Sequence, residues 1–397
     1  MIDRHHGFRL ARAIVAEEMA RQMPDLARRS PPGTWTGQTR IDEEGLGFDS
    51  LARIDLVTAM NQRFSLYRSG VEDYLLIRLT LGDWGELLAE HFRRAPLDLP
   101  IAFRSSGSTG APKEVQHSLG DLCEEVDAHV AAALPFRPHR ILSLVPPHHI
   151  YGFLFTVLLP ARLGCGVEDL AGRGPGALGR VIGGGDLAIG TPHLLSRALP
   201  FCGGPRQAAA ITSTAPAPSD LWDMARAAGL SGLVEIYGSS ESAGVGWRNA
   251  PEAAFGLLPH LAPGDPPLRH GVPLPLQDQL GWEVDGRFRV QGRRDGAVQV
   301  GGHNVHPAEI AAEIARHPLV AEAHVRPEGE RLKAFVVPEG NADPVRIEAE
   351  LRALLAERHI PAARPASYAF GAELPRTALG KPADWPDPVS DGQMQGS

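Results

Sequence analysis

The stretch RSSGSTGAPKEV, residues 104–115, is the part of this sequence from which its fold can be inferred first. Glycines at 107 and 110 let the backbone turn so that successive N–H groups point inward, and Lys113 adds a cation. Such a loop can cradle a polyphosphate, although it lacks the G-K-[ST] ending of a Walker A loop. A plain polar turn would fit most of these residues too. It would not explain the Pro-Lys ending in a chain with only three lysines.

Short apolar runs surround this loop and alternate with turns rich in glycine and proline. The runs are RILSLVPP, DLAIGTP, QAAAITSTAPAP and GLVEIYGSS, and each ends in a loop of small residues. That pattern is typical of parallel strands that deliver functional loops at their carboxyl ends. We therefore expect an α/β layered core over residues 100–292.

The flanking segments predict other structures. Residues 8–92 have apolar residues at helical spacing, and the basic, Pro-bearing joint RRAPLDLP at residues 93–100 separates them from the core. Residues 293–385 predict a small α+β domain in which VAEAHVRPEGERLKAFVVPEG forms a hairpin between two helices. Residues 386–397 are expected to be a tail. The fold class is thus α/β, with a helical N-terminal domain and a small α+β C-terminal domain.

Composition excludes several classes of function. The 397 residues allow two or three domains, and 43% hydrophobic with 22% charged residues is typical of a soluble globular protein. A net charge of -8 leaves no basic footprint for nucleic acid or an anionic membrane. The three cysteines lack the spacing of a zinc site or a disulfide framework. Without a signal peptide or a membrane-spanning run, we expect a cytoplasmic protein.

A second motif, EIYGSSESAG, follows the last of the predicted parallel strands. It places Tyr237, Gly238, Ser240 and Glu241 at the carboxyl end of the strand. A carboxylate there can hold Mg²⁺ beside phosphate oxygens, while the small residues leave room for a nucleotide.

Two later motifs complete a recognisable series. GRRDGAVQVGGHNVHPAEI marks the junction to the last domain, and LPRTALGK places Lys381 in a glycine loop. In this order, the phosphate loop, YGSSE and these two motifs resemble the AMP-forming acyl-adenylating superfamily. That superfamily contains acyl-CoA synthetases, adenylation domains of nonribosomal peptide synthetases and luciferases. The resemblance covers about residues 100–385.

The resemblance implies a nucleotide site built from several loops. The β- and γ-phosphates of ATP would be held by Ser105, Ser106, Gly107, Ser108, Thr109, Gly110 and Lys113. The adenine side of the site would be formed by Ser213, Thr214, Ala215, Tyr237 and Gly238, with Tyr237 stacking on the base. Ser240 stands where the family usually has threonine, towards the α-phosphate, and Glu241 would bind Mg²⁺.

The resemblance also implies residues for the ribose and for catalysis. Counting back fifteen residues from Arg293 gives Asp278 as the ribose-binding aspartate, with a solvated turn aspartate as the alternative. Arg293 would also reach the ribose. Asp295 resembles the hinge of a mobile C-terminal domain, and Lys381 on that domain would stabilise the negative charge of the transition state.

The segment PPHHIYGFLF resembles the one that carries the family's gate between ATP and the acyl pocket. His149 fits the gate by position, the adjacent His148 could point inward instead, and a plain core or surface histidine stays open. Tyr151, Phe153 and Phe155 could shape a pocket for an aromatic acid, which we favour over a long fatty acid.

The N-terminal segment contains LGFDSLARIDLVTAMNQRFSL and resembles an acyl or peptidyl carrier domain over residues 8–92. Ser50 would then carry 4'-phosphopantetheine at a helix start, with the helix packed through Leu51, Ile54, Val57 and Met60. The alternative is that Ser50 or Asp49 only caps this helix.

The adenylation segment itself is shorter than is usual in the family, so a partner subunit could complete it. We expect an enzyme that activates a small carboxylic acid with ATP and Mg²⁺ and loads it on the Ser50 arm. Its partners would be a phosphopantetheinyl transferase and a downstream synthase. One alternative is a ligase acting on free CoA or a separate acyl carrier protein, and another is a catalytically silent nucleotide-binding scaffold.

Overall fold

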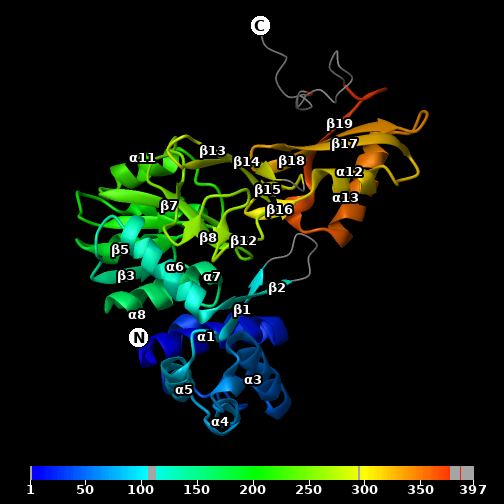
Figure 1. The fold of residues 1–397 in the computed structure, drawn as a ribbon. Coiled ribbons are helices and arrows are strands. Elements are labelled where there is room, and N and C mark those ends of the chain that lie inside the picture. The colour runs from blue at the N-terminus through cyan, green and yellow to red at the C-terminus, as the bar shows by residue number, and fades with distance from the viewer. Residues whose placement is uncertain (1, 106–112, 294–295, 376–384, 386–397) are drawn as a thin grey trace. The chain divides into compact units, whose positions relative to one another are not determined.

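The computed structural model describes residues 2–105, 113–293, 296–375 and Trp385 (Figure 1). The chain divides into two compact units. The first consists of residues 1–105, 114–276 and 280–290, and the second of residues 106–113, 277–279 and 291–397. Each unit has its own apolar core.

The first unit begins with a group of helices, as the sequence predicts. These are α1 (Arg4–Gln22), α2 (Pro24–Arg29), α3 (Ser50–Phe64), α4 (Glu72–Ile77) and α5 (Leu81–Arg94), with the 3-10 turns η1 (Pro32–Thr34) and η2 (Leu66–Arg68). Asp49 caps α3, because its carboxylate accepts the backbone N–H of Ala52 at 2.8 Å. Thr80 caps α5 in the same way through the N–H of Asp83 at 3.2 Å.

Helix α3 buries only half of the residues predicted to pack. Val57 and Met60 are buried, but Leu51 is 69% exposed and Ile54 is 50% exposed, so the prediction is wrong for these two. A helix turns by about 100° per residue, so a spacing of three residues drifts by roughly 60° at each step. Leu51 and Met60, three such steps apart, therefore lie on opposite faces of the helix.

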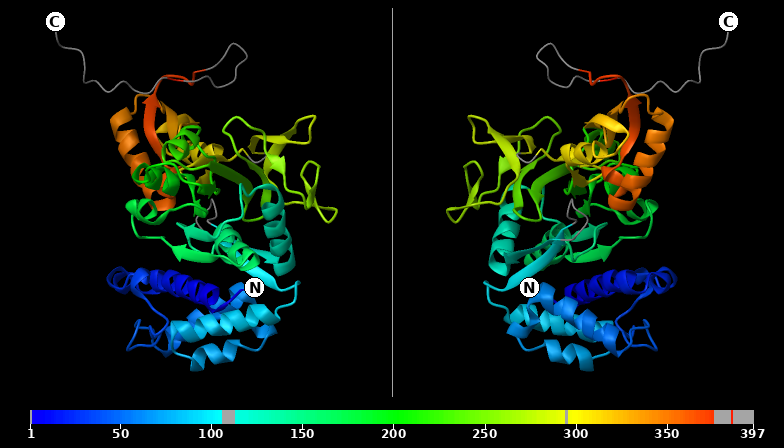
Figure 2. Two further views of the ribbon diagram at one scale, coloured as in Figure 1. Left: turned by 90° about the vertical axis from the view of Figure 1, so that its left-hand side faces the viewer. Right: turned by 90° about the vertical axis from the view of Figure 1, so that its right-hand side faces the viewer.

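The N-terminal helices lie beside the rest of the first unit (Figure 2). Buried residues of both parts form one apolar core. The ring of Phe153 lies 6.4 Å from Phe64 and 6.1 Å from Phe92, measured between centroids. Buried Arg9 on α1 donates from Nε to Asp169 Oδ1 at 2.9 Å. The expected boundary at residues 93–100 therefore does not separate two compact units, and a carrier-protein-like domain at residues 8–92 stays a prediction.

A seven-stranded sheet forms the centre of the first unit. In spatial order its strands are β4 (Gly166–Asp169), β3 (Arg140–Ser143), β5 (Asp186–Gly190), β6 (Ala209–Thr212), β7 (Gly232–Ser239), β8 (Ala243–Arg248) and β9 (Gly256–Leu257). The first five are parallel, and β8 and β9 are antiparallel. The four apolar runs that predicted strands are confirmed as β3, β5, β6 and β7, which lie side by side.

Shorter elements complete the first unit. The helical segments are α6 (Leu119–Ala132), α7 (Ile150–Phe153), the π-helical turn η3 (Leu154–Leu158), α8 (Leu159–Leu163), α9 (Gly176–Val181), α10 (Pro192–Ala198), η4 (Leu199–Phe201) and α11 (Asp220–Ala227). The small sheets are β1 (Pro100–Ser105) with β2 (Lys113–Ser118), and β10 (Leu261–Ala262) with β11 (Leu268–Arg269) and β12 (Val272–Pro273). A further pair, β13 (Asp278–Trp282) with β14 (Phe288–Arg293), runs through both units.

The second unit has the α+β fold that the sequence predicts. Its remaining elements are β15 (Val298–Val300), β16 (His303–Val305), α12 (Pro307–Ile314), β17 (Val320–Glu328), β18 (Arg331–Pro338), α13 (Pro344–Arg358), η5 (Pro361–Ala363) and β19 (Pro365–Phe370). Strands β17 and β18 pair antiparallel, which confirms the predicted hairpin, and β19 joins β18 in parallel.

Buried Lys333 on β18 secures the end of the described chain. Its Nζ donates to Glu328 Oε1 at 2.6 Å and to the carbonyl of Trp385 at 2.9 Å. None of the described helices is both long and apolar enough to cross a bilayer.

His91 gives a test of this fold. It is buried on α5, where Nε2 lies 2.9 Å from the carbonyl oxygen of Phe64, and burial lowers the pKa of its imidazole. The unfolded chain, whose histidines titrate near pH 6.5, therefore binds the proton first as the pH falls. We predict that the free energy of unfolding decreases below about pH 6.5, with a His91 contribution of at most about 1.4 kcal/mol per pH unit.

The measurement is denaturant unfolding between about pH 7.5 and 5.5 for the wild type and His91→Gln. The variant should show the shallower pH dependence, whereas His193→Gln, at an exposed position, should match the wild type. Equal slopes for the wild type and His91→Gln would contradict the prediction.

Candidate active site

The carboxyl ends of β6 and β7 form one edge of the candidate site. Ligands usually bind at this edge in open α/β sheets, where loops from neighbouring parallel strands meet. Ser213 is hydrogen-bonded to β7, since its hydroxyl donates to the carbonyl of Ile236 at 2.9 Å. The next residue, Thr214, has a φ of 83°, a conformation that residues other than glycine rarely adopt and that often marks a ligand site.

Glu235 on β7 also holds the loop that follows β6. The sequence motifs did not single out this residue. Its Oε1 accepts the N–H of Ala217 at 2.9 Å, and its Oε2 accepts from Arg248 Nε at 2.6 Å. Burial raises the pKa of the Glu235 carboxyl. The available signal was an acidic residue within the otherwise apolar strand LVEIYG.

Ser240 and Glu241 lie in the tight turn between β7 and β8. Ser239 and Ser242 brace this turn, since the N–H of each donates to the hydroxyl of the other at 3.1 Å. Glu241 is exposed and Ser240 is half-buried. An exposed carboxylate on a braced turn suits Mg²⁺, which is usually bound through one or two carboxylates together with phosphate oxygens.

The predicted phosphate loop connects β1 to β2. Ser105 ends β1 and exposed Lys113 begins β2. Ser106, Gly107, Ser108, Thr109 and Gly110 lie outside the described residues. Further along β2, His117 Nε2 lies 2.7 Å from the carbonyl oxygen of Ser240, and the imidazole must donate because a carbonyl only accepts. This bond joins the strand that leaves the loop to the turn that carries Glu241.

Tyr237 and Gly238 precede that turn. The Tyr237 ring is half-buried, with its centroid 5.4 Å from that of Phe255 and 5.6 Å from that of Phe288. A Cβ on Gly238 would come within 2.2 Å of the carbonyl oxygen of Ala243, so the hairpin itself requires glycine there. The roles of both residues towards a nucleotide stay predictions.

Asp278 and Arg293 belong to the second unit. Asp278 begins β13 and Arg293 ends β14, and the carboxylate Oδ1 lies 3.7 Å from the guanidinium Nη1. The spacing of fifteen residues thus corresponds to the two ends of one hairpin. The structure brings this pair together, while its contact with a ribose stays a prediction.

The two candidate gate histidines differ in their surroundings. His149 is exposed at the N-terminus of α7, and its ring centroid lies 4.4 Å from that of His148. His148 is buried, with Nε2 3.6 Å from Glu17 Oε2 on α1. Burial, together with the nearby positive charges of Arg63 and Arg104, places the pKa of His148 well below its usual value. His148 is therefore neutral at physiological pH.

The aromatic residues after these histidines lie in the apolar core of the first unit. Tyr151, Phe153 and Phe155 are all buried. The hydroxyl of Tyr151 donates to the carbonyl of Ile211 at 2.8 Å. Phe153 packs against Phe64 and Phe92, and the role of the three aromatic residues in an acyl pocket stays a prediction.

The remaining predicted residues fall into two groups. Asp295 and Lys381 lie outside the described residues, so their roles as hinge and catalytic cation stay predictions. Ser50 is described and is the exposed first residue of α3. Asp49 makes the capping bond of this helix, which leaves open what Ser50 does.

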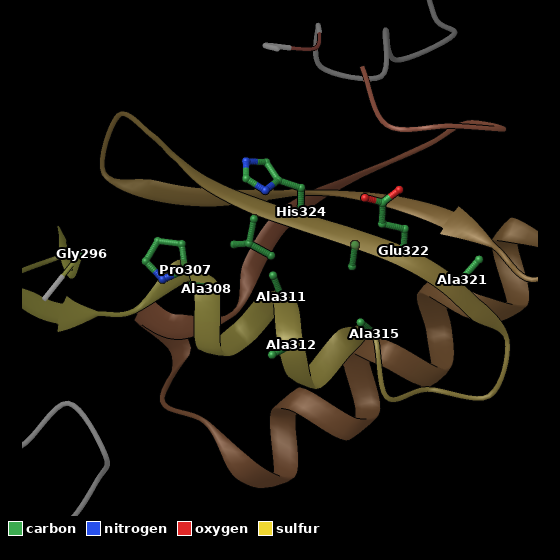
Figure 3. Close-up of a pocket in the computed structure, with 11 residues that line it drawn as sticks. Gly296, Pro307, Ala308, Ala311, Ala312, Ala315, Ala321, Glu322 and His324 are labelled. Carbon is green, nitrogen blue, oxygen red and sulfur yellow. The ribbon is translucent and has the colours of Figure 1, made fainter. Parts of the chain in front are cut away.

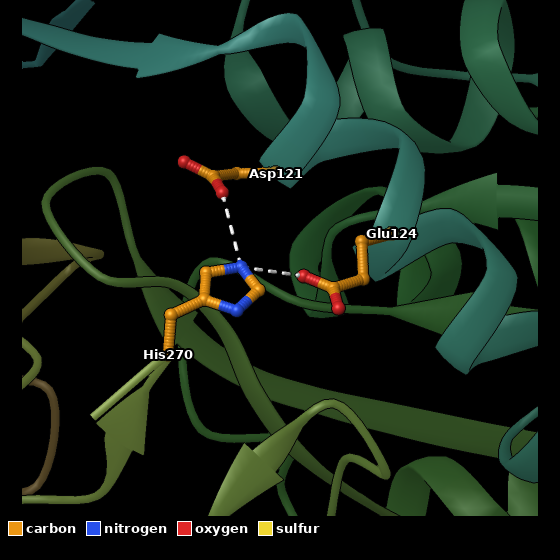
Figure 4. A group of neighbouring side chains, drawn as sticks. All are labelled: Asp121, Glu124 and His270. Carbon is orange, nitrogen blue, oxygen red and sulfur yellow. Dashed lines mark ion pairs between the residues drawn. The ribbon is translucent and has the colours of Figure 1, made fainter. Parts of the chain in front are cut away.

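Two other features carry no clear chemistry. A groove of about 530 Å³ in the second unit lies between α12 and β17 and is lined mostly by alanines, with Glu322 and His324 on the strand side (Figure 3). In the first unit, His270 Nε2 lies 3.1 Å from Glu124 Oε2 and 3.6 Å from Asp121 Oδ1 (Figure 4). These are partly exposed ion pairs, which are common without a bound metal.

The arrangement at the sheet edge suits a nucleoside polyphosphate and a divalent cation. Small residues and a strained backbone surround β6 and β7, a braced turn presents a carboxylate, and His117 connects that turn to the strand leaving the phosphate loop. Groups held in this way can stabilise negative charge that develops on phosphate oxygens.

Comparisons with known proteins agree with this chemistry. Residues 94–305 match the AMP-binding enzyme family, and residues 309–381 match the AMP-binding enzyme C-terminal domain. A 4-coumarate–CoA ligase of Rhodobacter capsulatus is 43% identical over 363 residues, which cover 89% of this chain and 94% of that protein. A 4-coumarate–CoA ligase of Halorhodospira halophila is 37% identical over 393 residues, 94% of this chain and 97% of the relative.

Solved structures share the fold at lower identity. An o-succinylbenzoate CoA synthetase of Bacillus subtilis aligns with a TM-score of 0.54 at 20% identity, over 72% of this chain and 69% of the other. A malonyl-CoA ligase aligns with a TM-score of 0.51 at 23% identity, over 71% and 73%.

We predict that Glu241→Gln weakens the binding of Mg²⁺, because an amide is a poorer ligand for this ion than a carboxylate. The Mg²⁺ concentration that gives half-maximal pyrophosphate release from ATP should rise by about tenfold or more. Glu252→Gln, at another exposed position of the same unit, should leave it unchanged. An unaltered Mg²⁺ midpoint in Glu241→Gln would remove Glu241 from the metal site.

Proposed function

This chain belongs to the AMP-forming acyl-adenylating superfamily, whose ligases activate a carboxylic acid with ATP and transfer it to a thiol, and we propose that this enzyme joins a small aromatic acid to CoA. It is an acid–thiol ligase that uses ATP, Mg²⁺ and CoA. The alternative of a catalytically silent scaffold is therefore not retained.

The observation that supports this substrate class is how much of the chain the similarity covers. The two 4-coumarate–CoA ligases have nearly the same extent as this chain, and the Halorhodospira halophila alignment takes in 94% of it. The N-terminal helices must therefore be largely included. We infer that they are a regular part of such ligases and that the acid is a phenylpropenoic acid or a close analogue.

In the first half-reaction, a carboxylate oxygen of the acid forms a bond to the α-phosphorus of ATP. The bond between that phosphorus and the bridging oxygen breaks, and pyrophosphate leaves with the electron pair. Mg²⁺, when bound, supplies positive charge to the phosphate oxygens. Glu241 would hold the ion, the Ser240 hydroxyl would donate to the α-phosphate, and Lys381 would stabilise the charge that develops there.

In the second half-reaction, the thiol of CoA loses its proton and its sulfur forms a bond to the acyl carbon. The bond from this carbon to the AMP oxygen breaks, so AMP leaves with the electron pair. Rotation about Asp295 would withdraw Lys381 between the two steps and open a path for the thiol.

In this proposal the N-terminal helices support residues next to the active site. Glu17 on α1 lies next to His148, and Glu18 on the same helix is buried and accepts from Arg104 Nη1 at 3.1 Å. Arg104 directly precedes Ser105, where the phosphate loop begins. Both the histidine pair and the entry to the phosphate loop are thus supported by α1.

A second candidate function keeps Ser50 as an attachment site. Ser50 is exposed at the N-terminus of α3, where the positive end of the helix dipole favours a phosphodiester. The adjacent Leu51 and Ile54 are exposed as well and could meet a phosphopantetheinyl transferase. In this reading the acid becomes a thioester on the enzyme's own arm and passes to a downstream synthase or a separate acyl carrier protein.

The deciding experiment supplies ATP, Mg²⁺, CoA and 4-coumarate to the wild type and to Ser50→Ala. We predict that both form the CoA thioester at similar rates, with one AMP and one pyrophosphate per product. Intact mass after treatment with CoA and a broad-specificity phosphopantetheinyl transferase tests the second candidate. A modified wild type that accepts the acyl group, with an inert Ser50→Ala, would favour loading on Ser50 instead.

A further prediction concerns Lys381. Lys381→Ala should slow formation of acyl-AMP by on the order of 100-fold or more, because a preorganised cation is lost from the transition state. Transfer from chemically prepared acyl-AMP to CoA should be much less affected. ATP–pyrophosphate exchange and thioester formation measure the two steps separately, and Arg331→Ala, an exposed cation of the same unit, is the control. Equal losses in both steps would contradict a specific role of Lys381 in acyl-AMP formation.

A further inference from the structure

We propose that Glu125 and Arg269, two buried residues outside every motif described above, are positioning residues for the turn that carries Ser240 and Glu241. This inference rests on the proposed function, because it assigns that turn to Mg²⁺ and the α-phosphate. It adds that the turn is fixed from behind by a buried ion pair.

Glu125 makes the first contact. It lies on α6 with no exposed surface, and its Oε1 accepts the backbone N–H of Gly244 at 2.8 Å. Gly244 is only three residues beyond Glu241 and belongs to β8. A Cβ on Gly244 would come within 2.4 Å of Glu125 Oε1, so this glycine permits the close approach.

Arg269 makes the second contact from a different element. It lies on β11 and is only 8% exposed. Its Nη2 donates to the carbonyl of Ser242 at 3.4 Å and lies 3.6 Å from Glu125 Oε2. The pair thus bonds one acceptor and one donor of the backbone just after Glu241.

His117 adds a third contact on the other side of Glu241, through the carbonyl of Ser240 at 2.7 Å. Three side chains from β2, α6 and β11 therefore hold the backbone of Ser240, Ser242 and Gly244. The side chain of Glu241 between them remains exposed. Such support leaves a ligand carboxylate with little freedom to lose when it binds a cation.

The charge state of the pair fits this role. Burial by itself favours a protonated Glu125, but the contacts with His129 and Arg269 hold the pKa of its carboxyl below the usual value. Glu125 is therefore an anion at neutral pH, and its bond to the N–H of Gly244 is charge-assisted. Buried ion pairs contribute little net stability, so retaining one behind this turn points to a need for fixed geometry.

The partly exposed ion pairs of Figure 4 lie near this buried pair in the chain but have no part in the proposed role. Asp121 and Glu124 are on α6, and His270 directly follows Arg269. Their side chains pair with one another and, in the described part of the chain, make no hydrogen bond to the turn. They provide a surface control on the same helix.

The test compares Glu125→Gln with Asp186→Asn. Asp186 is equally buried and also accepts a backbone N–H, that of Gly183 at 2.8 Å, together with Arg140 Nε at 3.0 Å. It begins β5 and so lies at the amino ends of the parallel strands, whereas the turn follows the carboxyl end of β7. Both changes remove one buried negative charge and keep the shape of the side chain.

We expect Glu125→Gln to raise the Mg²⁺ concentration for half-maximal ATP–pyrophosphate exchange by about three- to tenfold. Glu125→Gln and Asp186→Asn should lower the thermal midpoint by similar amounts. Only Glu125→Gln should change the Mg²⁺ response. Arg269→Met should repeat the Mg²⁺ effect, and Asp121→Asn should not. In the Glu241→Gln background, Glu125→Gln should add almost nothing, since the carboxylate that it positions is gone.

Three results would overturn the inference: the same Mg²⁺ midpoint in Glu125→Gln as in the wild type, an equal shift in Asp186→Asn, or full additivity with Glu241→Gln. If Glu125→Gln does not fold, Arg269→Met decides by the same criteria. Failure of the proposed function looks different, because the wild type would then show no exchange with any aromatic acid.

Discussion

The packing of Phe153 against Phe64 and Phe92 is the interaction on which the organisation of the first unit depends. It joins the N-terminal helices to the segment that follows the two candidate gate histidines, and detaching the helices would expose large aromatic surfaces to water. Buried Arg9 on α1 also forms an ion pair with partly buried Asp169 at the end of β4. The helices therefore cannot move as a free domain without breaking the apolar core of the first unit.

The loops at the edge of the central sheet need a second kind of support, from buried polar side chains. Strands β3, β5, β6 and β7 present their loops at one edge, but such loops are held only if polar groups behind them are satisfied. In this unit the support comes from buried side chains that reach across elements, such as Glu235 to Ala217 and Glu125 to Gly244. The site is thus fixed by a polar layer beneath it as well as by its own motifs.

Much of the fold and part of the site could be predicted from local patterns. Apolar runs that end in small-residue loops identified the parallel strands, and the spacing of Gly, Ser, Thr and Lys predicted a phosphate loop that lies mostly outside the described residues. The prediction failed where periodicity alone had to name a packing partner. Leu51 and Ile54 are exposed, although their helical spacing predicted that they pack. A helix or strand pattern shows which residues share a face, but not what that face meets.

The sequence by itself determined the chemistry: four motifs in order, each made of residues close together in the chain, indicate ATP-dependent activation of an acid. Only the tertiary structure decided that the N-terminal helices belong to the catalytic unit and that Glu125, His117 and Arg269 meet at one turn. The physical reason is distance along the chain. The three contacts join residues that are 27, 119 and 123 positions apart, and such contacts leave no periodic or local signal, because they depend on how whole elements pack.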